Sequence, residues 1–178
     1  MPDGSLPDFV SWSVFPFEGA LRIKTPLETL PADLPREGEG DRPCSLCAQT
    51  DDDYLWAGEQ WRVKAGPRKA APIVFLETRE HLDLDDFDDE LAAGFGRMTV
   101  ALDRAMRGAG NYGRVHLNRW GDGSAHFHVW FFARATGDRN MLGFGMPMWA
   151  DILPPMDRAD WRATMDAIAS GLAQDRHA

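Results

Sequence analysis

The sequence predicts an α+β domain, in which an antiparallel sheet has one long helix between its strands and another helix near the C-terminus. Three short segments rich in β-forming residues, at 54–57, 59–65 and 72–78, are separated by turns that contain Gly or Pro. One long segment with helical periodicity follows them, and two further strand-like segments come after it. Strands and helices do not alternate regularly, as they would in a parallel sheet, and this order favours the α+β class.

Residues 83–110 predict the long helix. Apolar residues recur there at the 3.6-residue period of one helix face, and Gly108 and Gly110 are expected to end the helix. Acidic residues crowd the segment 83–90, where they interact favourably with the helix dipole and form a solvated face. The apolar face consists of Leu91, Phe95, Met98, Leu102 and Met106.

A β-hairpin and a final helix are predicted after this helix. The hairpin strands are Tyr112–Trp120 and Ser124–Arg134, and the Gly-Asp-Gly sequence at 121–123 joins them. The last helix is expected to start near Asp157 and to bury one apolar face. That face consists of Trp161, Met165, Ile168 and Leu172.

A length of 178 residues is typical of one domain, and we expect three segments within it. Residues 1–43 are rich in Pro and Gly and are expected to form an extended N-terminal arm. Residues 44–134 are expected to form the folded domain, and residues 135–178 a C-terminal tail and helix packed on the same domain.

Charge and hydropathy restrict the partners that we expect. A net charge of −9 argues against DNA or RNA, because a protein that binds a polyanion needs a basic surface. No apolar run approaches the roughly 18 residues of a membrane span, and the N-terminus lacks the regions of a signal peptide. We therefore expect a cytoplasmic protein with no nucleic-acid polymer and no membrane as partner.

Two of the five histidines, His126 and His128, stand two residues apart in one predicted strand. Alternate side chains of a strand share a face, so both histidines are expected to point the same way as Trp130. The residues between them are apolar and belong to the core: Phe127, Val129 and Phe131. The pair is either a functional site or two half-exposed residues of a sheet.

The only two cysteines, Cys44 and Cys47, have a two-residue spacing that lets both thiolates bind one tetrahedral metal ion. Two further ligands would be needed. The alternatives are a redox pair, which lacks the expected strand–helix context, and a pair of buried thiols.

The sequence resembles the histidine triad (HIT) superfamily. The resemblance is carried by HFHVW at 126–130, by the preceding NRWGDGSA, and by the order of CSLC, two short strands, IVFLETREHLDLDDF and a long helix. It extends from Cys44 to Arg134 and is closest to the zinc-bearing branch that includes HIT hydrolases and galactose-1-phosphate uridylyltransferase. The resemblance implies a HIT-like antiparallel sheet for the domain 44–134.

The resemblance also implies roles for residues near the histidine pair. His128, at the middle triad position, would be the nucleophile that attacks an α-phosphorus and forms a nucleotidyl-histidine intermediate. Asn118 and Ser124 would hydrogen-bond the phosphoryl oxygens, and Arg119 and Arg134 would attract the anion. Trp130 stands where the family has His or Gln, and it either stacks on a base or packs under the tail around Trp149.

By the same resemblance, Cys44, Cys47, His81 and His126 would bind one structural zinc ion. Such a closed Cys2His2 set would fasten the N-terminal segment to the strand that presents His128. His116, on the neighbouring predicted strand, is an alternative ligand.

We therefore expect a nucleotidyl hydrolase or transferase. Its substrate would be a dinucleoside polyphosphate, a nucleotide sugar or a similar nucleotide phosphoester. The first alternative is a non-catalytic, zinc-stabilised nucleotide-binding module, and the second is an interaction protein that uses its arm and tail. HIT proteins are often homodimers, so a homodimer is possible here.

Overall fold

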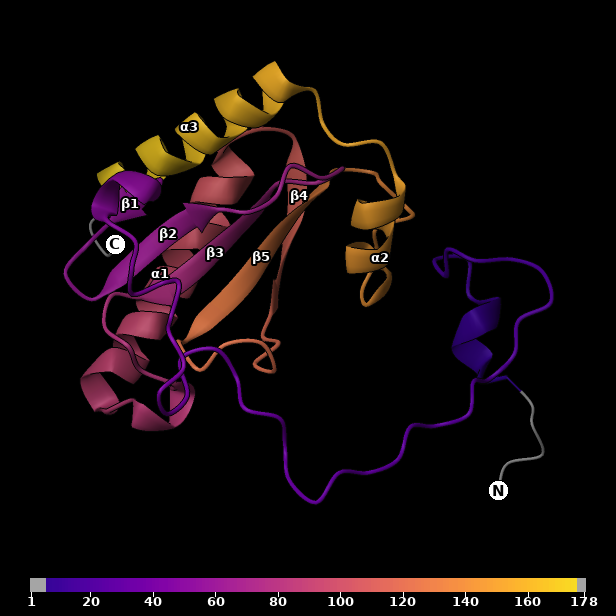
Figure 1. Cartoon of the computed structure of the whole chain (residues 1–178). Helices are drawn as coiled ribbons and strands as arrows, with labels where there is room; N and C mark the ends of the chain where they lie inside the picture. Colours follow the sequence, from indigo (N-terminus) through magenta and orange to yellow (C-terminus); the bar gives the residue numbers. More distant parts are fainter. Residues whose placement is uncertain (1–5, 176–178) are drawn as a thin grey trace.

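An antiparallel five-stranded sheet, with the strand order β1-β2-β3-β5-β4, forms the centre of the fold (Figure 1). The computed structural model describes residues 6–175, so the ends of the expected arm and tail, 1–5 and 176–178, lie outside it. Its strands are β1 (Trp56–Ala57), β2 (Trp61–Ala65), β3 (Ile73–Thr78), β4 (Tyr112–Asn118) and β5 (His128–Ala135). Its helices are α1 (Asp89–Gly108), α2 (Gly145–Ile152) and α3 (Arg158–Gln174). The predicted α+β class is confirmed.

Helices α1 and α3 cover one face of the sheet and form the main core with it. The helix periodicity is confirmed, because Leu102 and Met106 of α1 and Ile168 and Leu172 of α3 are fully buried against the sheet. Gly171 brings the two helices close together, since a Cβ atom there would lie 3.1 Å from the Cβ of Ala105.

Helix α1 begins at Asp89, later than the acidic segment at 83–90 suggested. Asp83 caps a short 3-10 turn (Leu84–Asp86), and Asp88 caps α1 by accepting a hydrogen bond from the Leu91 amide at 2.8 Å. Aspartate side chains that bind nearby backbone amides favour such caps over helix interiors. The acidic segment is therefore a turn followed by a helix cap.

The predicted hairpin is correct in its pairing but wrong in its turn. Strands β4 and β5 are antiparallel neighbours, yet β5 begins at His128 and residues 119–127 form a long connection. The backbone of this connection pairs elsewhere: Ala125 donates to the carbonyl of Glu37, and Phe127 donates to the carbonyl of Leu82. His126 therefore precedes the strand, whereas His128 belongs to it.

Helix α2 packs on the other face of the sheet, over Ile73 and Phe132. No periodic pattern predicts this helix, because it has only eight residues and carries Pro147 in its first turn. Trp130 and Trp149 lie at the edge of this second core. One side of Trp130 therefore packs near the tail, as one of the two interpretations of its role expected.

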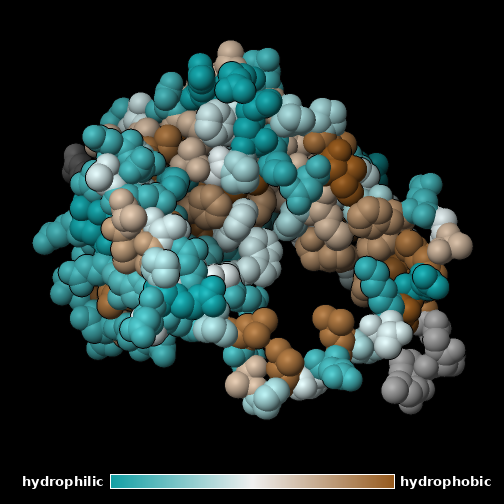
Figure 2. Space-filling model, in the orientation of Figure 1, coloured by the Kyte–Doolittle hydropathy of each residue, from teal (hydrophilic) through white to brown (hydrophobic). Residues whose placement is uncertain are grey.

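The N-terminal arm contacts the domain at two places and is exposed between them. Phe9 and Trp12 pack on Phe144, and the indole of Trp149 donates to the carbonyl of Val14 at 2.7 Å. Apolar side chains are exposed along the stretch between the contacts, around an opening visible in Figure 2. They are Leu21, Ile23, Leu27, Leu30 and Leu34. No helix within residues 6–175 is long and apolar enough to cross a bilayer.

Candidate functional site

Four side chains from separate segments converge beside the start of β5. Their ligand atoms all lie within 4.8 Å of one another, and the residues are Cys44, Cys47, His81 and His126. The Cys47 sulfur lies 3.2 Å from Nδ1 of His81, and both sulfurs lie 3.5 Å from Nδ1 of His126. One tetrahedral zinc ion, with bonds of about 2.0–2.3 Å, would hold its ligand atoms about 3.3–3.8 Å apart. The group can therefore bind one metal ion.

The ring of His126 is held in the orientation that a metal ligand requires. Its Nε2–H donates to the carbonyl of Thr78 at 2.8 Å, which leaves the lone pair of Nδ1 facing the sulfurs. The side chain is only 1% exposed, and this burial lowers the pKa of His126. The neutral imidazole, which is the form that binds a metal, is therefore favoured.

Two neighbouring thiols favour a cation between them. Desolvation and the adjacent Cys44 raise the pKa of Cys47 to about 11, because a second thiolate beside the first is unfavourable. A divalent metal removes this penalty and binds both sulfurs as thiolates.

Gly38 of the arm lies directly against His81. A Cβ atom at this position would lie 2.5 Å from Cε1 of the His81 ring, and the backbone has a positive φ of 83°. The neighbouring Glu37 donates its amide to the Gly123 carbonyl at 3.0 Å, and its carboxylate accepts a hydrogen bond from the Ser45 amide. The arm is therefore fastened to the metal-ligand group and to the connection 119–127 together.

The ring of His128 is fixed by a hydrogen bond at one of its two nitrogens. Its Nδ1–H donates to the backbone carbonyl of His126 at 3.0 Å, so the neutral ring carries its lone pair on Nε2. The side chain is half-buried and lines a cavity of about 220 Å³ on the sheet face opposite α1. A histidine with this tautomer can attack an electrophilic phosphorus without first losing a proton.

The cavity brings together three of the predicted site residues: His128, Ser124 and Trp130. Its remaining walls are formed by Glu37, Ser45, Leu46, Lys64, Phe75 and Glu77. Ser124 also accepts a hydrogen bond from the His126 amide at 3.2 Å. The edge of the Trp130 ring meets Phe75, with ring centroids 4.4 Å apart, so the two form an aromatic wall.

Glu77 and Lys64 also line the cavity, although no sequence motif singled them out as site residues. Glu77 is 3% exposed and pairs with His128 across β3 and β5, and the hydroxyl of Tyr54 donates to its carboxyl group at 3.0 Å. Burial raises the pKa of Glu77, although Tyr54, Lys64, His128 and Arg62 oppose the shift. The signal was present in the sequence, since an acid interrupts the apolar strand IVFLET two residues after Phe75.

The structure places the other predicted residues away from this cavity. Asn118 ends β4 and pairs with Trp130, but it does not line the cavity. Arg119 pairs with Asp83 at 2.6 Å, and Arg134 donates to the backbone carbonyls of 135 and 138. His116 lies opposite Phe132 and does not belong to the metal-ligand group.

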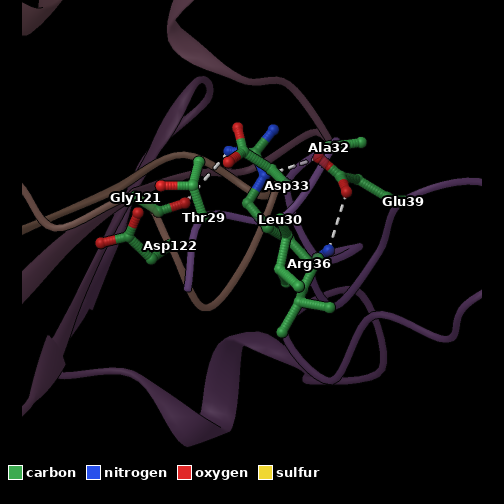
Figure 3. A pocket seen from close by; sticks show the side chains of 9 residues that line it. Thr29, Leu30, Ala32, Asp33, Arg36, Glu39, Gly121 and Asp122 are labelled. Atoms are coloured by element: carbon green, nitrogen blue, oxygen red, sulfur yellow. Dashed lines mark hydrogen bonds and ion pairs between the residues drawn. The ribbon is translucent and has the colours of Figure 1, made fainter. Parts of the chain in front are cut away.

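A second cavity, of about 630 Å³, lies between the arm and the connection 119–127 (Figure 3). Arg36 is at its edge and binds Glu39 at 2.6 Å and Asp83 at 2.7 Å. Burial alone would raise the pKa of Asp83, but hydrogen bonds from the Leu84 amide and Arg36 lower it. Asp83 therefore joins two arginines, Arg36 of the arm and Arg119 of the connection.

Comparisons with known proteins show the same fold. No family model matches the sequence, and no curated protein matches it. A hypothetical histidine triad nucleotide-binding protein from Sulfolobus tokodaii has a TM-score of 0.55 and 12% identity, over 73% of this chain and 92% of the other. A Zn-bound histidine triad family protein from Mycobacterium smegmatis has a TM-score of 0.53 and 21% identity, over 74% and 94%. A histidine triad protein from Marinobacter aquaeolei has a TM-score of 0.54 and 18% identity, over 68% and 88%. The chain thus has the histidine triad fold.

Substitution Asp83→Asn is expected to release the arm from the connection 119–127, because it removes the carboxylate shared by two arginines. Limited trypsin digestion followed by mass spectrometry should then show faster cleavage at Arg36 than in wild type. The matched control is Asp85→Asn in the same turn. Equal cleavage rates in both variants would contradict the role of Asp83.

Proposed function

We propose that this chain, which has the histidine triad fold, transfers or hydrolyses a nucleoside monophosphate unit through His128. The substrate class is a nucleotide phosphoester, such as a dinucleoside polyphosphate or a nucleotide sugar. The observation that carries the proposal is the His128 ring, whose Nδ1–H is bound to the His126 carbonyl while Nε2 is free beside a cavity.

In the first step, Nε2 of His128 attacks the α-phosphorus and the bond to the leaving group breaks. The His126 carbonyl, which accepts the Nδ1 proton, stabilises the positive charge that develops on the ring. Ser124, in the cavity wall, is placed to hydrogen-bond a phosphoryl oxygen. A water or another acceptor then attacks the nucleotidyl-histidine and restores the free ring. The proposal assigns no step to Asn118, Arg119 or Arg134.

We also propose that the group of Cys44, Cys47, His81 and His126 binds a structural zinc ion. The donor set supports this, because two thiols and two imidazoles form a complete tetrahedral zinc shell with no open position. Bound there, the ion would supply folding energy rather than chemistry, on the order of 10 kcal/mol at neutral pH. The chain's own residues would carry the reaction.

A second candidate is a module that binds a nucleotide without turnover. Trp130 favours it, because this residue occupies the third triad position and an indole has one N–H donor and no basic group. The cavity, its aromatic wall and the tautomer of His128 would be the same in both cases, so only turnover separates them.

The proposed partner is a nucleotide-type small molecule, and the proposed location is the cytoplasm, where both thiols stay reduced. A net charge of −9 argues against a polyanion as partner, because binding a polyanion needs a basic surface. A homodimer through the edge strand β4 is compatible with this arrangement.

Brief mixing with a panel of dinucleoside polyphosphates and nucleotide sugars is expected to give a nucleotidyl adduct or product with wild type. His128→Ala should abolish both, because the substitution removes the nucleophile. Intact-mass spectrometry measures the adduct, and chromatography measures the product. The matched control is His116→Ala, which changes a histidine outside the cavity and should keep the activity.

Absence of product across the panel, together with an increase in Tm on ligand addition, would favour the binding module. Product formation by His128→Ala at the wild-type rate would contradict the assignment of the nucleophile.

Protein purified without chelator is expected to contain one zinc per chain by elemental analysis. Gly38→Ala should lower the zinc affinity by on the order of 10-fold, because its Cβ would displace the His81 ring. Gly40→Ala is the matched control, since Gly40 also has a positive φ but would place its Cβ in open space. Less than about half a zinc per wild-type chain, with both thiols titratable, would contradict the proposed site.

A further inference from the structure

Trp130 leaves the proposed reaction without an acid from the third triad position. When the bond from phosphorus to the leaving oxygen breaks, that oxygen departs as a basic anion unless a proton reaches it. A basic anion is a poor leaving group. The indole N–H of Trp130 is too weak an acid for this role. Another group in the cavity must therefore supply the proton if the leaving group is basic.

Besides His128, five side chains with oxygen or charged nitrogen atoms line the cavity: Glu37, Ser45, Ser124, Lys64 and Glu77. Glu37 accepts hydrogen bonds from Ser45, which lower its pKa and keep it ionised, so it holds no proton to give. The hydroxyl groups of Ser45 and Ser124 are weak acids. Lys64 donates from Nζ to the side-chain oxygen of Gln49 at 2.5 Å, and this hydrogen bond holds its ammonium group.

Glu77 has the position of an acid, and its burial favours the protonated form. It lies opposite His128 on the neighbouring antiparallel strand, where paired Cβ atoms are about 4.5–5.5 Å apart. Tyr54 donates to its Oε2, so the other oxygen, Oε1, can carry the proton. Burial raises the pKa of Glu77 against the opposing effects of its neighbours, and a raised pKa suits a group that must donate a proton. The neighbours are Tyr54, Lys64, His128 and Arg62.

We propose that Glu77 is the general acid of this site, which protonates the leaving group in place of the missing third triad residue. This inference rests on the proposed function of His128. It assigns a catalytic role to a side chain that the histidine motif does not contain.

The lone pair of His128 Nε2 forms a bond to the α-phosphorus, the bond from phosphorus to the leaving oxygen breaks, and the Glu77 proton moves to that oxygen. In the second step a water attacks the phosphorus and gives a proton to the Glu77 carboxylate. The P–N bond then breaks and its electron pair returns to His128.

The test uses the phenyl ester and the 4-nitrophenyl ester of each of four nucleotides. The nucleotides are AMP, GMP, CMP and UMP. Nitrophenolate leaves without a proton, whereas phenolate is far more basic and needs an acid. Glu77→Gln is expected to lose about 100-fold or more in kcat/KM for the phenyl ester and to keep most of its activity on the 4-nitrophenyl ester. The activity on the second ester also shows that the variant is folded.

Lys64→Gln is the matched control, because it changes another charged side chain of the same cavity. Its effect should be the same on both esters. Two results would overturn the assignment of Glu77 but leave the proposed function standing. One is a loss of activity in Lys64→Gln that is selective for the phenyl ester, and the other is an equal loss of activity on both esters in a folded Glu77→Gln. No hydrolysis of any ester by wild type would instead overturn the proposed function, and the inference with it.

If Glu77→Gln does not fold, the solvent deuterium isotope effect of wild type decides the question. A larger effect for the phenyl ester than for the 4-nitrophenyl ester, lost above the pKa of a carboxyl group in the pH profile, supports Glu77. Equal effects on both esters overturn the proposal.

Discussion

The ring of His126 turns Nδ1 towards the two cysteine sulfurs and donates from Nε2 to the carbonyl of Thr78, while its own carbonyl accepts the Nδ1 proton of His128. One residue thus connects the metal-ligand group, the end of β3 and His128. A shift of this ring would move the carbonyl that sets the tautomer of His128. The orientation of His128 in the cavity therefore depends on the metal-ligand residues, which do not line the cavity.

The N-terminal arm takes part in the same arrangement. Glu37 pairs with the connection 119–127 and with Ser45, Gly38 packs on the His81 ring, and Arg36 reaches Asp83. These contacts hold segments that are far apart in the sequence around one metal-ligand group. The exposed middle of the arm spans two fixed points, the aromatic contacts at Phe144 and the contacts of Arg36–Gly38.

Patterns that depend on local chemistry were predictable from the sequence, and patterns that depend on distant pairing were not. The 3.6-residue period indicated α1 and α3, and the family resemblance implied the four members of the metal-ligand group. The start of β5 was misplaced because the backbone of Ala125 pairs with Glu37, about ninety residues earlier in the chain. Glu77 was missed because only the register of β3 against β5 brings it opposite His128. The arginines drew attention as anion ligands, yet Asp83 binds one of them and backbone carbonyls bind the other.

The link from the metal-ligand group through His126 to His128 is tested most directly by the tautomer of His128. ¹⁵N–¹H correlation spectra of the histidine rings report this tautomer in metal-loaded and metal-free protein. We expect the His128 ring to carry a proton on Nδ1 and none on Nε2 in the metal-loaded protein, and to show a mixture of tautomers after the metal is removed. A proton on Nε2 of His128 in the loaded protein, or a spectrum unchanged by metal removal, would contradict the link from the metal-ligand group through His126 to the nucleophile.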